Sequence, residues 1–188
     1  MDNEKKRFTH LKIHTQYSIC EGAIKIQDLS KYCKENKIHS IGLSDNFNLC
    51  GALEFSEEVS KTGTQPIISS QINFKFKNFT GKIAIFAKSE KGFRNLTKLS
   101  SKSYLDVEKE SKPYCTIDDL ISNNEDLIIL SGGIDSLFSN LIRNNHIKHL
   151  EDIVSKLKKA FSDRFYFEIQ RHDDIGEKQI ENIFIDLS

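Results

Sequence analysis

The sequence has no net charge, no closely paired cysteines and no long apolar run, and each absence argues against a class of protein. Its 188 residues contain 27 Lys and Arg against 27 Asp and Glu, so no overall field steers the chain onto nucleic acid or an anionic membrane. No apolar stretch approaches the roughly 20 residues needed to cross a bilayer. Residues 1–7 form a charged N-terminal tail without the apolar core of a signal peptide. We therefore expect a cytoplasmic protein with no membrane partner.

The cysteines are few and far apart. Cys20, Cys33, Cys50 and Cys115 form no C-x-x-C pair, so neither a zinc ribbon nor a redox dithiol is indicated. Isolated cysteines of this kind are typical of small buried apolar side chains in a reducing compartment.

Apolar periodicity in the first 71 residues predicts alternating strands and helices. The strands are expected at 8–18, 40–44 and 66–71, and the helices at 26–36 and 52–63. In the first strand, Leu11 and Ile13 lie on one face, and the polar His10, Lys12 and His14 lie on the other. The β-α-β-α-β order implies parallel strands covered by helices.

The second half of the sequence begins with strict alternation over residues 74–79, followed by an apolar run at 83–87. A hairpin with one buried face explains this pattern, and an aromatic and basic stripe for single-stranded nucleic acid is the alternative. Further helices are predicted around 93–99, from 116, over 150–161 and from 180, and strands at 127–130 and 165–169. For Ser131–Gly133 a tight strand-to-helix turn is preferred over a phosphate-binding nest.

Several segments resemble, in order, the motifs of PHP (polymerase and histidinol phosphatase) domains. The version that begins the alpha subunit of bacterial DNA polymerase III is the most similar. The matching segments are residues 8–18, 21–23, 41–52, 65–68, 92–99, 130–133 and 165–172. The resemblance implies an α/β fold, a distorted (βα)7-type barrel, over residues 8–188. It also implies that the barrel is incomplete at the C-terminus, because at least one strand and a final Asp-x-His motif are expected beyond Ser188.

In active members of the family, side chains at the carboxyl ends of the strands hold divalent metals that activate water for phosphoester hydrolysis. Carried onto this sequence, the two histidines of the first motif fall on Lys12 and His14. The next acidic position falls on Glu21, and the Asp-His pair falls on Asp45 and Asn46. Two of the expected histidine ligands are therefore replaced.

The remaining family positions lie in the second half of the sequence. The Glu of the third motif falls on Gln71, a frequent Cys falls on Gly133, and a ligand histidine matches His172. An ammonium at Lys12, about 4 Å from a divalent ion, would be repelled by roughly 8 kcal/mol at an effective dielectric of 20. The resemblance therefore implies a vestigial site without metal or catalytic residues, with His14 and His172 as hydrogen-bonded buried histidines. Lys12 would pair with Asp45 or Glu21.

The expected function is that of the PHP domain of a replicative DNA-directed DNA polymerase. The role would be structural and would include docking the proofreading exonuclease subunit. The polymerase palm and its magnesium would belong to the rest of the alpha chain, which also contacts DNA. One alternative is an active, metal-dependent PHP phosphoesterase using zinc or manganese, for proofreading or as a stand-alone phosphatase. Another is a direct DNA-binding module.

Overall fold

The structure is a computed structural model that describes residues 8–107, 112–174 and 176–188. The charged tail predicted at residues 1–7 lies outside these ranges. The chain forms two compact units, unit 1 up to Ser69 and unit 2 from Ser70, and each unit is described by itself. No helix within the described ranges is long and apolar enough to span a bilayer.

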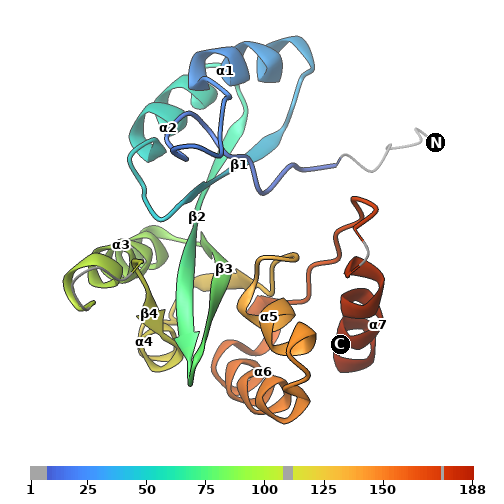
Figure 1. Cartoon of the computed structure of the whole chain (residues 1–188). Helices are drawn as coiled ribbons and strands as arrows, with labels where there is room; N and C mark the ends of the chain where they lie inside the picture. The colour runs from blue at the N-terminus through green and yellow to red at the C-terminus, as the bar shows by residue number, and fades with distance from the viewer. Residues whose placement is uncertain (1–7, 108–111, 175) are drawn as a thin grey trace. The chain divides into compact units, whose positions relative to one another are not determined.

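Both units combine helices and strands (Figure 1). Unit 1 contains α1 (Ile26–Glu35), β1 (Ser40–Asn46), α2 (Ala52–Ser60) and the start of β2 (Gln65–Phe76). Unit 2 contains the rest of β2, then β3 (Phe79–Ala87), α3 (Glu90–Leu105), β4 (Cys115–Thr116), α4 (Ile117–Ser122) and β5 (Leu127–Leu130). It continues with α5 (Leu137–Arg143), α6 (Ile147–Phe161), a 3-10 turn (Ser162–Arg164), β6 (Phe165–Tyr166) and α7 (Glu177–Leu187).

The strand order is β1-β2-β3-β5-β6, with β4 paired to β2, and over the described residues this sheet is open. The predicted α/β class is confirmed. The expectation of parallel strands concerned residues 8–71, and there the bridges of Ile13 with Leu43 and of Thr15 with Ile24 are parallel. Farther along the chain, β2 with β4 and β5 with β6 also pair in parallel. Strands β3 and β5 run antiparallel, in the register Ala84↔Leu130 to Ala87↔Leu127. The predicted hairpin explains the reversal, because the chain turns at Lys77 (φ +55°) and β3 returns along β2.

The first predicted strand, residues 8–18, forms only isolated bridges, Ile13 with Leu43 and Thr15 with Ile24. The backbone amide of Thr15 donates to the carboxylate of Asp45 at 2.7 Å, so a side chain takes the place of a neighbouring strand. Gly42 allows this segment to lie against β1, since a Cβ there would be 2.2 Å from the carbonyl oxygen of Leu11.

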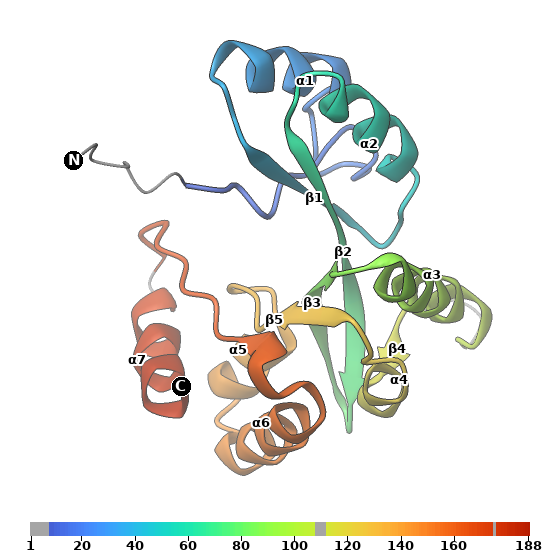
Figure 2. The same ribbon diagram turned by 180° about the vertical axis from the view of Figure 1, so that it is seen from behind.

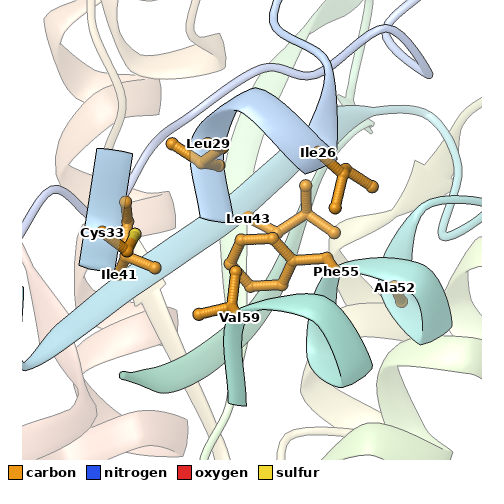
Figure 3. Packing of buried hydrophobic residues seen from close by; sticks show 8 residues of the cluster. All are labelled: Ile26, Leu29, Cys33, Ile41, Leu43, Ala52, Phe55 and Val59. Carbon is orange, nitrogen blue, oxygen red and sulfur yellow. The ribbon is translucent and has the colours of Figure 1, made fainter. Parts of the chain in front are cut away.

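The core of unit 1 lies between α1, β1 and α2 (Figure 3). Its eight side chains are buried and point toward one another: Ile26, Leu29, Cys33, Ile41, Leu43, Ala52, Phe55 and Val59. The helical members recur at three- and four-residue spacing, which places them on one face of each helix. The two helices predicted from this periodicity are confirmed.

In unit 2, α3 and α4 lie on one side of β2 and β3, while α5 and α6 lie on the other (Figures 1 and 2). An aromatic cluster joins α5 and α7 to β6 and the residue that follows it, Phe167. The ring of Phe138 lies 5.7 Å from that of Phe165 and 6.4 Å from that of Phe184, and Phe167 lies 5.1 Å from Phe184. This cluster fixes α7 onto the unit. The predicted strand at 165–169 is shorter than expected, because only Phe165 and Tyr166 pair with β5.

The expectation of buried cysteines is correct for Cys33 and Cys115 and wrong for Cys20 and Cys50, which are exposed. The thiol of Cys115 lies within hydrogen-bonding distance, 3.2 Å, of the carbonyl oxygen of Leu99. Burial, followed by the nearby charge of Asp119, raises the pKa of Cys115 to about 12.

We therefore expect a thiol reagent to modify Cys20 and Cys50 rapidly in the native protein. Cys33 and Cys115 should react at least about 100-fold more slowly, because the buried thiols react only after opening. Mass spectrometry of the labelled peptides, with a urea-unfolded control, measures both rates. Because the pKa of Cys115 is raised from 9.0 in the folded state, its contribution to stability should be lost as pH rises from 9 toward 12. Fast native labelling of Cys115 would contradict the described packing.

Candidate functional site

The predicted site residues are divided between the two units. Unit 1 contains Lys12, His14, Glu21, Asp45 and Asn46, and unit 2 contains Gln71, Gly133 and His172. Each group is described within its own unit.

The centre of the group in unit 1 is Asp45, whose side chain is fully buried at the end of β1. Its Oδ1 accepts hydrogen bonds from the Thr15 amide and the Ser18 hydroxyl, both at 2.7 Å. Its Oδ2 accepts one from the Thr15 hydroxyl, also at 2.7 Å. Short bonds to a carboxylate are the strong kind, and these three hold the turn after residue 14 against β1. With Glu21 and Asn46, these residues form what we call the Asp45 cluster.

Asn46, the residue that replaces a family histidine, is bound within the same cluster. Its amide nitrogen donates to the carboxylate of Glu21, and its backbone amide donates to the Ser18 hydroxyl at 3.0 Å. Within the described chain, its Oδ1 is a buried oxygen without a hydrogen-bond partner, as is the hydroxyl of Ser44. A buried oxygen without a hydrogen bond costs free energy, so the other contacts of Asn46 must hold its side chain in place against that cost.

His14 and Lys12 flank the Asp45 cluster and are half-buried. His14 Nδ1 lies 3.4 Å from the Ser18 oxygen. Because Ser18 uses its single proton toward Asp45, a bond here requires the proton to be on Nδ1. The pairing of Lys12 with Asp45 or Glu21 stays a prediction.

Thr15 and Ser18 were not predicted as site residues, although both lie in the turn of the first matched motif. The turn itself is held by bonds on either side. The Tyr17 hydroxyl donates to Glu54 at 2.7 Å, and the Asn48 amide donates to the Tyr17 carbonyl at 2.9 Å. Two hydroxyl residues directly after a polar strand are the signal that could have identified them as donors to a strand-end carboxylate.

In unit 2, Gly133 belongs to the tight turn predicted between β5 and α5. Gly132 has φ +79°, and the Gly133 carbonyl accepts from the Ser136 amide at 3.0 Å and the Ser139 hydroxyl at 2.7 Å. A Cβ at Gly133 would lie 1.8 Å from Oε1 of Gln170, so that amide fills the space a side chain would need. Gln71 lies in β2 and is 6 % exposed.

His172 lies in the segment before α7 and is bound to Glu177, the first residue of that helix. Its backbone amide donates to Oε2 at 2.6 Å, and its Nδ1 lies 2.9 Å from Oε1. The prediction of a hydrogen-bonded histidine is correct. The prediction that it is buried is wrong, because its side chain is 71 % exposed. The buried member of the pair is the Glu177 carboxylate. Its position at the N-terminus of α7 is favourable, because the positive end of the helix dipole lies there.

Replacing Glu177 by glutamine should loosen residues 172–174. The bonds from the His172 backbone amide, and then from its ring, lower the pKa of Glu177 below its ordinary 4.5. A carboxyl group with a lowered folded pKa stabilises above its unfolded pKa, and this contribution is lost as pH falls through the folded pKa. We expect lower protection against amide exchange, relative to the intrinsic rate at each pH, at His172 and Asp174 in the variant, and in the wild type as pH falls below 4.5. Asp186→Asn, an exposed change on the same helix, is the control, and equal exchange in both variants would contradict the assignment.

Each unit can be examined for side chains that are arranged to bind a divalent metal. Among the described residues, no group of three or more His, Cys, Asp or Glu side chains is arranged to hold a metal ion. The Asp45 oxygens accept from hydroxyls and an amide, Glu21 accepts from Asn46, and Gly133 has no donor. These residues do not fit the metal site of the active family members, so we derive no metal-dependent step for this chain.

The family model and the relatives with similar sequences indicate the same family. The PHP domain family model matches residues 10–172. DNA polymerase III subunit alpha of Borreliella burgdorferi is 36% identical over 189 residues, covering 95% of this chain and 16% of that protein. The subunit of Caulobacter vibrioides is 34% identical, covering 91% of this chain and 16% of that protein. The chain therefore spans about a sixth of the length of these relatives.

Among solved structures, the fold is similar to that of a protein from Bifidobacterium adolescentis assigned as a metal-dependent phosphoesterase. The TM-score is 0.59, with 11% identity, and the match covers 95% of this chain and 82% of that one. At this identity the likeness concerns the fold alone. Because the family model covers most of the sequence, this chain belongs to the PHP domain family, as a domain homologous to the N-terminal region of bacterial DNA polymerase III alpha subunits.

Proposed function

We propose that this PHP domain serves a replicative polymerase in the cytoplasm as a structural and docking element, without metal-dependent phosphoesterase activity. The partners are the rest of the alpha chain and the proofreading exonuclease subunit. In the complete protein the reaction is DNA-directed DNA synthesis, and the magnesium and the DNA contacts of that reaction belong to the rest of the alpha chain. The similarity to polymerase alpha subunits supports this context.

The observation that carries the proposal is the Asp45 cluster. Asp45 is one of the family ligand positions that this sequence retains, and its carboxylate accepts three hydrogen bonds from Thr15 and Ser18. These bonds join a turn to the end of a strand, which is a structural role. A metal would have to compete with donors that the fold already supplies, and the neighbouring Asn46 is a weak ligand in place of a histidine.

Added metal and model phosphoesters test this proposal. A ligand that binds the folded state raises the melting temperature, by an amount equivalent to about 2.7 kcal/mol at 100 times its dissociation constant. We expect zinc, manganese and magnesium to leave the melting temperature unchanged, and phosphoester hydrolysis to stay at the level of a buffer blank. An active PHP phosphoesterase is the positive control. Stoichiometric zinc or manganese after dialysis, together with hydrolysis, would favour the phosphoesterase alternative.

The docking role has its own measurement. The chain should bind the proofreading exonuclease subunit of the same replicase in size-exclusion chromatography and calorimetry. Binding that depends on added zinc or manganese would contradict a docking role that is independent of metal.

A further inference from the structure

Unit 2 contains an open groove with a volume of about 460 Å³, which includes none of the candidate site residues of the family motifs. The end of β2, the β4–α4 segment and α6 surround it, and both ribbon views show the end of β2 between α4 and α6 (Figures 1 and 2). Its lining residues are Lys75, Phe76, Lys77, Tyr114, Thr116, Ile117, Asp118 and Lys156. Three of the eight are lysines, and Asp118 is the single acid among them.

Aromatic rings hold the lysine ammonium groups in this groove. The Nζ atoms of Lys77 and Lys156 lie 5.4 and 5.2 Å from the centre of the same ring, that of Phe76. The Nζ of Lys75 lies 5.1 Å from the ring centre of Tyr114. Phe76 is only 8 % exposed, so its ring is a fixed part of the core. Cation–π contacts with buried or half-buried rings restrict these otherwise flexible side chains.

The local charge balance is positive despite the neutrality of the chain. The Nζ of Lys156 lies 3.6 Å from a carboxylate oxygen of Asp152, and the two side chains of that pair are 46 % and 41 % exposed. Lys77 Nζ lies 3.1 Å from Nδ1 of His149. The pKa of His149 is lowered, first by burial and then by the charge of Lys77. Like charges gathered in one groove repel each other, and a bound anion would relieve that repulsion.

We propose that this groove binds the phosphodiester backbone of single-stranded nucleic acid. Lysine is a compact cationic donor suited to phosphate oxygens, and three such donors in one groove can contact successive phosphates. The volume is within the range of sites that take ligands of nucleotide size. The half-buried ring of Tyr114 lies beside the lysines, where a base can stack. This inference does not rest on the structural and docking role proposed above.

Fluorescence anisotropy with a labelled oligothymidylate, at several salt concentrations, tests this inference on the whole chain. The triple variant Lys75→Gln, Lys77→Gln, Lys156→Gln should bind at least about tenfold more weakly at low salt. Its slope of log affinity against log salt should become shallower by about 2, since each phosphate contact accounts for about 0.7 on single strands. The triple arginine variant at the same positions keeps the charges and should retain binding.

A matched control removes the same charge from other exposed lysines, with Lys31→Gln, Lys98→Gln and Lys159→Gln, the last on α6 beside Lys156. This variant should bind like the wild type, and thermal melting confirms that each variant is folded. Equal weakening in the two glutamine variants, or no wild-type binding at low salt, would overturn the proposal. So would equal displacement of the oligonucleotide by inorganic phosphate at matched ionic strength, or preferential binding of an acidic peptide or a duplex.

Discussion

Replacing Asp45 by alanine is expected to lower the free energy of unfolding of unit 1 by about 3–5 kcal/mol. The change removes a fully buried carboxylate that accepts three bonds at 2.7 Å. The Thr15 amide then has no acceptor, because residues 8–18 form no continuous ladder with β1. The alanine variant leaves buried donors without partners, and this makes it more harmful than the loss of an exposed ion pair.

Asparagine at position 45 should cost less, about 1–2 kcal/mol, because its oxygen can still face the Thr15 amide. Its NH2 group can donate to the Thr15 hydroxyl, which can rotate to accept. Glu57→Ala, an exposed acidic position on α2, is the control and should change stability by at most about 0.5 kcal/mol. An alanine variant as stable as the control would show that Asp45 does not hold the turn.

Phe55→Ala should destabilise unit 1 by about 3–5 kcal/mol, since removing a buried phenylalanine loses transfer free energy and leaves a cavity. The ring is fully buried in the cluster shared by α1, β1 and α2 (Figure 3). Phe55→Leu keeps most of the apolar volume and should cost about 1–2 kcal/mol. Leu53→Ala, two residues earlier on the same helix at a side chain that is 71 % exposed, should cost at most about 0.5 kcal/mol.

The chain has no tryptophan to report on unit 1, so amide hydrogen exchange read by mass spectrometry is the suitable measurement. Peptides from α1 and α2 should exchange faster in Phe55→Ala and at the wild-type rate in Leu53→Ala. Peptides from α6 report on unit 2 in the same experiment. If Leu53→Ala accelerated exchange in α1 as much as Phe55→Ala, the assignment of the buried face of α2 would be wrong.

Local pattern was sufficient to predict the elements whose signal is contained in neighbouring residues. Helix α6 has apolar side chains at helical spacing from Leu150 to Phe161, and α4 begins at a capping box that joins Thr116 and Asp119. The hairpin of β2 and β3 follows from the alternation over residues 74–79 and the apolar run at 83–87 on the other side of a turn. In each case the residues that decide the structure are within one or two turns of one another, so no knowledge of the rest of the fold was needed.

The strand-to-helix turn at Ser131–Gly133 implied a helix after it, but periodicity did not locate the residues of α5, because most of them are buried: Leu137, Phe138, Ser139, Leu141 and Ile142. Periodicity identifies a helix only when one face meets solvent. The length of strand β6 was overestimated for a related reason, because an apolar run in the sequence does not show where the neighbouring strand ends.

The ordered motifs in the sequence identified Asp45, Asn46 and His172 as candidate site residues, but not their hydrogen-bond partners. Thr15 and Ser18 lie 30 and 27 residues before Asp45 in the sequence. They can be recognised as its partners only once the fold has placed their turn against β1. The exposure of His172 could not be predicted either, because it depends on the contact between the preceding loop and Glu177. By itself, then, the sequence determined the family and most of the helices and strands, from short-range pattern. Burial, hydrogen-bond partners and the gathering of lysines around Phe76 were decided by the tertiary structure, because they depend on distances between residues far apart in the chain.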